Sequence, residues 1–333
     1  MTADAGRPAG VEPYVRGVAW PAGAGVSYPR ADPADARRLP ADTWSAAQLP
    51  AGVRLEIAGD ARQVRVEYVT TTADLGRRGP AAGTTFEVWR DGRRVDEAAA
   101  DLGVGTVRLH LGHGPGRAVV YLPEAMKPLV TKVVAEQGLI EPAPPQPRWI
   151  AYGDSIAEGW IASSPAASWV AAAGRRHGFD VVNMGYAGAA RGEIVSAEQI
   201  ASREADVISL THGTNCWSMI PYSTDMMRSS TEAFLRVVRA GHPGVPLVVA
   251  SPLVRPDAED RPNRLGATQA DLRRAMEEAV RAVGDDRTTL VPGRDVLSPE
   301  LLGDGVHPDD AGHRVLAQVF GDAVRTAYDA ATD

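Results

Sequence analysis

The sequence has only one cysteine, Cys216, in 333 residues, so no disulfide can form within the chain. Such sparse cysteine usage is typical of proteins kept in a reducing compartment. No stretch of about eighteen apolar residues occurs, and Met1 to Gly10 lacks the basic and then apolar runs of a secretory signal. These absences predict a cytoplasmic protein that does not insert into a membrane.

Clustered positive charge is also lacking. The 35 Lys and Arg residues are outnumbered by 42 Asp and Glu, the net charge is −7, and no dense Lys/Arg run occurs. Nucleic-acid-binding surfaces need such clusters, so no nucleic-acid partner is expected. A nucleotide-binding protein is disfavoured as well, because no Gly-x-Gly-x-x-Gly motif or Walker-type lysine follows the first strand of the second half.

What the chain does have is enough apolar material for a globular core, since 44% of its residues are hydrophobic and 23% are charged. Its length favours two domains. In residues 1–140, apolar and polar residues alternate over short runs with no comparable helical stretch between them. The strand-like runs are residues 53–57, 64–69, 86–89, 106–111, 118–122 and 129–134. We therefore predict an antiparallel β-sandwich, jelly-roll-like, for this first domain.

Two details refine the expected sandwich. Arg90-Asp91-Gly92-Arg93 predicts a two-residue hairpin turn, because Asp-Gly accepts the positive φ angles of a type I′ turn. His110 and His113 have no carboxylate or cysteine partner in sequence, so no metal site is expected there. The sandwich could bind carbohydrate, wall one side of a substrate cleft or stabilise its neighbour, and the sequence leaves these three roles open.

Residues 141–147 hold four prolines, so we expect an extended, stiff linker there and a domain boundary. From residue 148 to residue 333, strands alternate with helices. The strands are expected at residues 149–152, 181–184, 206–211, 246–250 and 288–291, and the helices near 166–177, 192–204, 225–240, 268–283 and 309–330. This pattern predicts an α/β domain with a doubly wound, five-stranded parallel sheet, flavodoxin-like in its strand order 2-1-3-4-5.

Ser155 lies where the first of these strands ends. The run Trp149 to Tyr152 has the composition of a buried strand, Gly153 permits a sharp turn, and a helix would begin at Ser155. A serine there is a candidate nucleophile, because helix-start N–H groups favour negative charge developing beside it. The alternative is that Ser155 only caps the helix, since serine is a preferred N-cap residue.

Helpers for such a serine are expected at the ends of neighbouring strands. Asn215 follows the third strand and would face Ser155 across the switch point of the sheet. Gly188 follows the second strand, where a glycine lets its N–H approach a ligand closely. With the N–H of Ser155 these groups could form an oxyanion hole, a device in which one donor contributes about 3 to 4 kcal/mol. The alternative for each segment, which is the commoner one when the segment is taken alone, is an ordinary structural turn.

A serine hydroxyl also needs a base. His307 is the histidine with an acid at a suggestive spacing, in Asp304-Gly305-Val306-His307-Pro308. In a tight loop the Asp304 carboxylate can accept from Nδ1 of His307, which leaves Nε2 free to act on Ser155. The alternative is a surface Asp-Gly turn with an incidental histidine. The expected position of the fifth strand at the sheet edge requires this loop to reach back over the fourth strand.

Four blocks in order resemble the SGNH, or GDSL-type, hydrolase superfamily, in a two-domain form with an N-terminal β-sandwich. The blocks are Gly153-Asp154-Ser155, Asn183 to Gly188, Gly213-Thr214-Asn215, and Asp304 to Pro308. The resemblance implies Ser155 as nucleophile, Gly188 and Asn215 as oxyanion donors, His307 as base and Asp304 as its orienting acid, with neither metal nor cofactor. One departure is Cys216-Trp217 after Asn215, where the family often has aspartate.

Five further residues near these blocks are candidate substrate contacts: Glu158, Trp160, Tyr186, Arg191 and Trp217. Core packing or surface pairing is the alternative for each of them. Cys216 is expected to be a small packing residue and not a nucleophile, because no histidine pairs with it in the sequence pattern.

The predicted function is therefore a serine esterase that hydrolyses a carboxylic ester, such as a sugar acetate or another small acyl ester, through an acyl-enzyme. An acyltransferase that passes the acyl group to an alcohol would use the same residues and stays open as an alternative. A non-catalytic glycan-binding protein is the third alternative. In both enzymatic cases the expected partner is a small-molecule acyl ester, and a carbohydrate-linked ester is one such candidate. The sequence does not define the oligomeric state.

Overall fold

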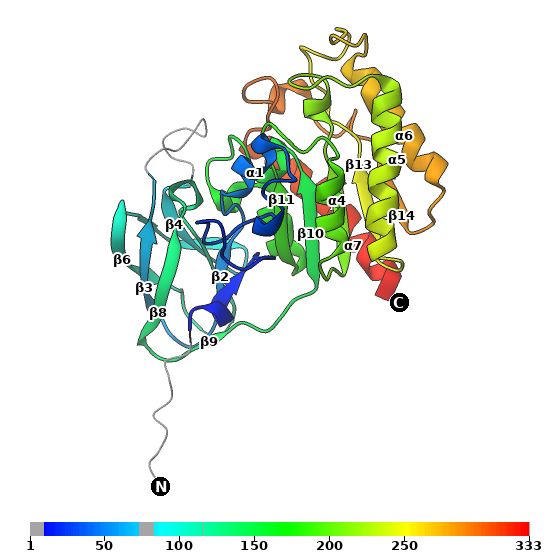
Figure 1. The fold of residues 1–333 in the computed structure, drawn as a ribbon. Coiled ribbons are helices and arrows are strands. Elements are labelled where there is room, and N and C mark those ends of the chain that lie inside the picture. The colour runs from blue at the N-terminus through cyan, green and yellow to red at the C-terminus, as the bar shows by residue number, and fades with distance from the viewer. Residues whose placement is uncertain (1–9, 73–82, 115, 333) are drawn as a thin grey trace.

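The computed structural model describes residues 10–72, 83–114 and 116–332 of the chain (Figure 1). An all-β part built mainly from the first half of the sequence lies beside an α/β part built from the second half. The prediction of an antiparallel sandwich followed by a doubly wound parallel sheet is confirmed.

The all-β part consists of two antiparallel sheets. One sheet has the order β1 (Val15–Arg16), β2 (Arg54–Gly59), β7 (Ala118–Tyr121), β4 (Thr85–Arg90) and β5 (Arg93–Ala99), with β9 (Ile140–Pro142) also paired to β2. The other sheet has the order β6 (Gly103–His110), β3 (Gln63–Thr70) and β8 (Leu129–Gln137). Residues of β3 alternate between buried and half-buried, which is the period expected of a strand with one face in a core.

The predicted hairpin turn is confirmed. Asp91 and Gly92 have φ angles of 49° and 73°, and Arg90 pairs with Arg93 across the turn. Among the described residues, no α-helix lies between the strand-like runs, as predicted, and α1 (Ala41–Ala47) precedes the first of them, between β1 and β2. The run 141–147, expected to be a linker, begins inside β9 and leads into β10 (Arg148–Gly153).

The α/β part contains one parallel sheet in the order β11 (Asp180–Gly185), β10, β12 (Val207–Thr211), β13 (Leu247–Ala250) and β14 (Thr288–Val291). In chain order this is 2-1-3-4-5, as predicted from the alternation of strands and helices. Strands β10 and β12 are neighbours, so the chain diverges between them, and in sheets of this kind ligands bind at the carboxyl ends of such strands.

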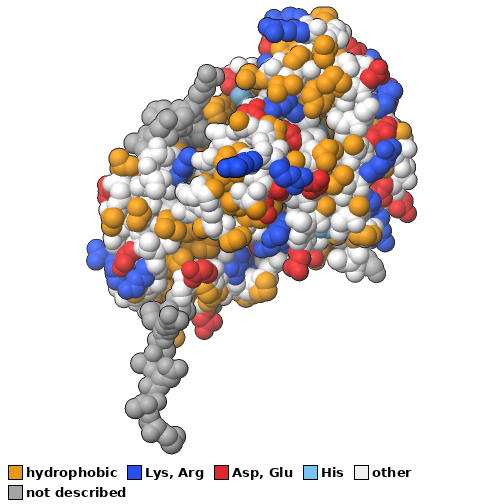
Figure 2. Space-filling view, in the orientation of Figure 1, with side chains coloured by type: hydrophobic (Ala, Val, Ile, Leu, Met, Phe, Trp, Pro, Cys, Tyr) orange, Lys and Arg blue, Asp and Glu red, His pale blue; other side chains and the backbone are white. Residues whose placement is uncertain are grey.

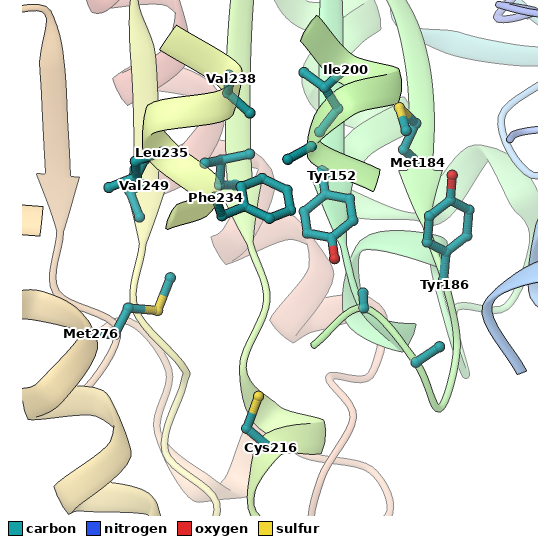
Figure 3. Packing of buried hydrophobic residues seen from close by; sticks show 14 of the residues in the cluster. Tyr152, Met184, Tyr186, Ile200, Cys216, Phe234, Leu235, Val238, Val249 and Met276 are labelled. Atoms are coloured by element: carbon teal, nitrogen blue, oxygen red, sulfur yellow. The ribbon is translucent and has the colours of Figure 1, made fainter. Parts of the chain in front are cut away.

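Helices cover both faces of the parallel sheet. On one face lie α4 (Ile194–Ala201), α5 (Thr224–Gly241) and α6 (Gln269–Val283), and on the other lie α3 (Trp169–His177) and α7 (Asp310–Thr332). Alternate residues of β10 serve the two cores: Trp149 and Ala151 pack toward α3 and α7, while Ile150 and Tyr152 pack toward α4 and α5. Figure 3 shows Tyr152 beside Phe234 of α5.

The segment that joins β1 to β2 leaves the sandwich and packs on the α/β sheet. Its side chains Trp20, Ala31, Leu39 and Ala47 belong to the same apolar cluster as Tyr152. Figure 1 shows this blue segment, with α1, against the green elements of the second half. The segment had been predicted as part of the sandwich, so its packing differs from that expectation.

Polar and cationic side chains also join the two parts. Arg54 of β2 is buried and contacts Asp180 at 3.1 Å, and Arg175 of α3 stacks over the ring of Trp89 at 4.1 Å. On the outside, Lys/Arg and Asp/Glu side chains are interspersed over the face drawn in Figure 2. Within the described ranges, no helix combines the length and apolar character needed to cross a membrane.

Candidate active site

Ser155 stands at the carboxyl end of β10, at the first position of the short helix α2 (Ser155–Glu158). The helix is capped by Asp154, whose carboxylate accepts from the Ile156 N–H at 3.0 Å. The alternative in which Ser155 serves only as the cap is therefore wrong. Position 153 requires glycine, because a Cβ there would lie 2.4 Å from Oγ1 of Thr211 and 2.6 Å from Cβ of Ala157. The local fold thus leaves the Ser155 hydroxyl available to another partner.

That partner is His307. The Oγ of Ser155 lies 2.8 Å from Nε2 of His307, and Nδ1 of His307 lies 2.7 Å from Oδ2 of Asp304. The other Asp304 oxygen accepts from the N–H groups of Val306 and His307, at 3.0 and 2.7 Å. Burial opposes ionisation of Asp304, but these hydrogen bonds and the nearby imidazole outweigh it and lower the pKa of the carboxyl.

The loop that carries His307 reaches the centre of the sheet, as this arrangement requires. It is anchored by Asp310, whose carboxylate accepts from the Ser163 N–H at 2.8 Å, and by His313, whose Nε2 lies 3.2 Å from the Trp160 carbonyl. The ring of Trp160 stands 5.8 Å from that of His307. The start of α7 and the segment after α2 therefore hold the imidazole beside Ser155.

Gly188 and Asn215 lie in the loops that follow β11 and β12, the two strands paired with β10. Asn215 is buried in the turn η5 (Thr214–Cys216) after β12, and its Nδ2 donates to the Ala189 carbonyl at 2.6 Å. Gly188 has φ of 73°, a conformation that favours glycine, and a Cβ there would meet nothing within 4 Å. The second Asn215 amide proton and the N–H groups of Gly188 and Ser155 have no acceptor among the described residues. Three donors, in the segments that follow β10, β11 and β12, are thus left without a protein acceptor among the described residues.

Burial controls two other ionisable groups close to this site. Asp154 is fully enclosed, and burial raises the pKa of its carboxyl despite hydrogen bonds that favour the charged form. Burial also raises the pKa of the Cys216 thiol far above its ordinary value, so the thiol stays protonated. Its sulfur lies 3.8 Å from the Arg191 carbonyl, and its side chain belongs to the same apolar cluster as Tyr152. Figure 3 labels it on the turn after β12. Cys216 packs in the interior, as expected.

Three of the five candidate substrate contacts point into the protein. Glu158 contacts Arg30 at 2.8 Å, the Tyr186 hydroxyl donates to the Arg30 carbonyl at 2.7 Å, and Arg191 contacts Asp42 at 2.7 Å. All three side chains are buried and bonded to protein groups, so none of them lines an open surface at the site. Each side chain instead bonds to a residue of the segment between β1 and β2.

The two tryptophans differ from one another. Trp160 is half-buried and faces His307. Trp217 is buried, donates from Nε1 to the Arg261 carbonyl at 2.8 Å, and lies under the guanidinium groups of Arg255 and Arg261. Of the two, Trp160 has the placement of a substrate-lining side chain.

Three residues that were not predicted from the sequence also support the site: Arg30, Asp42 and Glu193. Glu193 accepts from the Tyr152 hydroxyl at 2.8 Å and from the Arg191 N–H at 3.1 Å. None of the three belongs to a recognisable sequence motif. Arg30 and Asp42 also lie in residues 1–140, which were predicted to form the other domain. Within the described ranges, no group of three or more His, Cys, Asp or Glu side chains is arranged to hold a metal ion.

His212, three residues before Asn215, leads to a prediction about pH. It is enclosed by Tyr152 and Phe234, and burial lowers its pKa to about 4, with Glu193 opposing the shift. An unfolded histidine takes up its proton near pH 6.5, so folding is disfavoured increasingly as pH falls from about 6.5 to 4. This group should cost roughly 3 kcal/mol of unfolding free energy across that window.

We expect His212→Phe to remove that cost, since an aromatic ring fits the same surroundings. Urea unfolding at pH 7 and pH 4.5 should show a smaller loss of stability for the variant than for the wild type. His110→Phe, at an exposed histidine of the sandwich, is the matched control and should lose as much stability as the wild type. Equal losses in all three proteins would contradict the assignment.

The comparisons with known proteins agree with this geometry. Residues 151–315 match the family described as GDSL-like Lipase/Acylhydrolase. The matched range contains Ser155, Gly188, Asn215, Asp304 and His307. Residues 151–315, within the α/β part of the chain, therefore form a GDSL-like lipase/acylhydrolase domain. The comparison with curated protein sequences finds no match.

Solved structures share the fold over both parts. The salicylyl-acyltransferase SsfX3 from a tetracycline biosynthetic pathway superimposes with a TM-score of 0.77 at 24% identity, covering 91% of each chain. A structure from Bacteroides ovatus ATCC 8483 described as GDSL-like gives 0.77 at 20% identity, covering 96% of this chain and 97% of the other. A family two carbohydrate esterase from Clostridium thermocellum gives 0.62 at 16% identity, covering 83% and 92%.

Family and fold together define the class. Over residues 151–315 the chain carries an enzyme domain of the lipase/acylhydrolase class.

Proposed function

We propose that the protein is a serine esterase that hydrolyses a carboxylic ester through an acyl-enzyme on Ser155. The observation that carries the proposal is the unbroken hydrogen-bonded chain from Asp304 through His307 to Ser155, with separations of 2.7 and 2.8 Å. Side chains distant in sequence meet there at the carboxyl end of β10 in the parallel sheet. Such a chain allows a histidine to take the serine proton as the hydroxyl attacks.

The proposed reaction has two halves. Ser155 Oγ attacks the ester carbonyl, His307 Nε2 takes the hydroxyl proton, and the resulting oxyanion accepts from the Ser155 N–H, the Gly188 N–H and the Asn215 amide. The intermediate collapses, and His307 returns the proton to the leaving alcohol. Water then attacks the acyl-enzyme with the same base and donors, releasing the carboxylic acid and the free serine. These steps use no metal or cofactor.

The proposed substrate is a small acyl ester, such as a sugar acetate. Trp160 beside His307 offers a flat apolar wall for either half of the ester. Met219 and Ile220, on the loop after Asn215, and Met226 at the start of α5 expose apolar surface. Structures with the same fold include family two carbohydrate esterases and an acetyl xylan esterase. These similarities favour an acyl ester whose alcohol is a sugar.

Hydrolysis is preferred over acyl transfer because water can reach the proposed base. The side chains of His307 and Asp304 are 17% and 43% exposed. A transferase needs to keep water from the acyl-enzyme while an acceptor alcohol binds. The second candidate function, transfer of the acyl group to an alcohol, is favoured by the likeness to the salicylyl-acyltransferase over both domains.

The test compares the two outcomes directly. The protein is incubated with p-nitrophenyl esters of increasing acyl length and with sugar acetates, with and without an added alcohol, and product masses are followed. We expect free acid in both cases and fastest turnover for short acyl groups. Ester formed on the added alcohol as the main product in dilute aqueous solution would overturn the hydrolase proposal in favour of the transferase.

A further inference from the structure

The loop that carries Gly188 is held in place by residues outside the matched range 151–315. The segment between β1 and β2, which contains η2 (Pro33–Asp35) and α1, lies against this loop. Two of its charged side chains, Arg30 and Asp42, contact groups on either side of Gly188. Their contacts define a support that the catalytic residues alone would lack.

Arg30 supports the beginning of the loop. It is 1% exposed, and its guanidinium contacts Oε2 of Glu158 at 2.8 Å and donates to the carbonyl of Gly185 at the end of β11. Oε2 of Glu158 also accepts from the Ala187 N–H at 3.1 Å. The Tyr186 hydroxyl closes the arrangement by donating to the Arg30 carbonyl. The residues that precede Gly188 are thereby fixed to the segment.

Asp42 supports the loop through Arg191. Nη2 of Arg191 lies 2.7 Å from Oδ2 of Asp42, and Nη1 donates to the Gly188 carbonyl at 2.9 Å. The neighbouring Thr43 hydroxyl donates to Glu193 at 3.1 Å, and Glu193 in turn accepts from the Arg191 N–H. Arg191 is 3% exposed, so its orientation depends on these partners.

The two supports have one consequence for Gly188. Gly188 has a φ of 73°, and a Cβ placed on it would have no neighbour within 4 Å. Packing of other side chains around its α-carbon therefore does not fix its orientation. Its orientation is set by hydrogen bonds to the groups on either side. An N–H that stabilises an oxyanion must be aimed within a few tenths of an ångström, and a shift of about 1 Å can cost roughly 100-fold in rate.

We propose that Asp42 and Arg30 are positioning residues, which brace the Gly188 loop so that its N–H faces the oxyanion formed on Ser155. The inference rests on the proposed esterase function and extends the active site to a segment that the family match does not include. It also gives the first half of the chain a role in the reaction beyond that of an accessory domain.

Asp42→Ala tests the proposal. The Asp42 side chain is 42% exposed, and Glu193 remains 3.8 Å from Arg191 in its absence, so its loss should leave the fold intact. Arg30 is less suitable for substitution, because it is buried and donates to several backbone carbonyls. With p-nitrophenyl acetate, we expect kcat to fall roughly tenfold while KM changes less than about twofold, because only the transition state uses the oxyanion donors. Inactivation by a serine-directed phosphonate should slow by the same factor, and Asp42→Glu should restore part of the rate.

Asp35→Ala is the matched control. Asp35 lies in the same segment and binds Arg38 at 2.9 Å and Gln199 at 3.1 Å, without any contact to the Gly188 loop. We expect its kcat and phosphonate rate to equal those of the wild type. If Asp42→Ala behaves as Asp35→Ala does in an active enzyme, the positioning role is wrong and the esterase proposal stands. If the wild type neither turns over esters nor reacts with the phosphonate, the esterase proposal itself fails.

Discussion

Ser155→Ala is expected to reduce kcat for p-nitrophenyl acetate by roughly 10⁵- to 10⁶-fold, close to the background rate. The substitution removes the oxygen that attacks the carbonyl, and no other nucleophile in the described site can replace it, because the Cys216 thiol is buried and protonated. The three proposed oxyanion donors and the proposed binding surface would remain. Their residual effect sets the floor of the measured rate.

The stability of this variant should be nearly unchanged. The Ser155 hydroxyl bonds only to His307 in the described structure, and Asp154 keeps its role as the cap of α2. Thermal unfolding of wild type and variant checks this point. Ser163→Ala, at an exposed serine nearby, is the matched kinetic control and should retain full activity. Comparable turnover in Ser155→Ala and the wild type would show that the reaction uses another group.

Asp304→Asn is expected to lower kcat by about 10²- to 10⁴-fold. One oxygen at this position must accept the Val306 and His307 N–H groups, so the amide oxygen of the variant would take that place. The amide nitrogen would then face Nδ1 of His307 as a donor. The imidazole would have to carry its proton on Nε2, where it could no longer accept the proton of Ser155.

The lowered pKa of Asp304 keeps the wild-type carboxylate charged at mildly acidic pH, so its own protonation should not limit the rate there. Steady-state kinetics at pH 6 to 8 measure the effect of the variant. Asp309→Asn is the matched control, because Asp309 accepts from the Gly312 N–H at 2.8 Å at the start of α7 and does not contact His307. Equal rates for both variants would remove Asp304 from the proposed mechanism.

The sequence predicted the parts of the fold that depend on local pattern. The order of the parallel strands followed from the alternation of short apolar runs with helices, and the Asp91-Gly92 turn followed from two adjacent residues that tolerate positive φ. The meeting of Ser155 with His307 was expected from family blocks rather than from periodicity, because no local pattern shows how far the loop after β14 extends across the sheet.

The support behind Gly188 could not be predicted from pattern. Helix α1 has only seven residues, too few to give a clear helical period, and it is stabilised by packing on another domain. The isolated charges of Arg30, Glu158 and Arg191 look like surface residues in sequence. These residues are buried only because partners more than 100 residues away in sequence pair with them. Arg30 pairs with Glu158, and Arg191 pairs with Asp42.

The central claim is that Ser155 becomes acylated with His307 as its base. The most direct measurement is the intact mass of the protein after reaction with a serine-directed phosphonate, followed by peptide mapping. The account predicts a single adduct on Ser155, strongly slowed in His307→Ala and absent in Ser155→Ala. An unlabelled wild-type protein, or an adduct on a different residue, would contradict it.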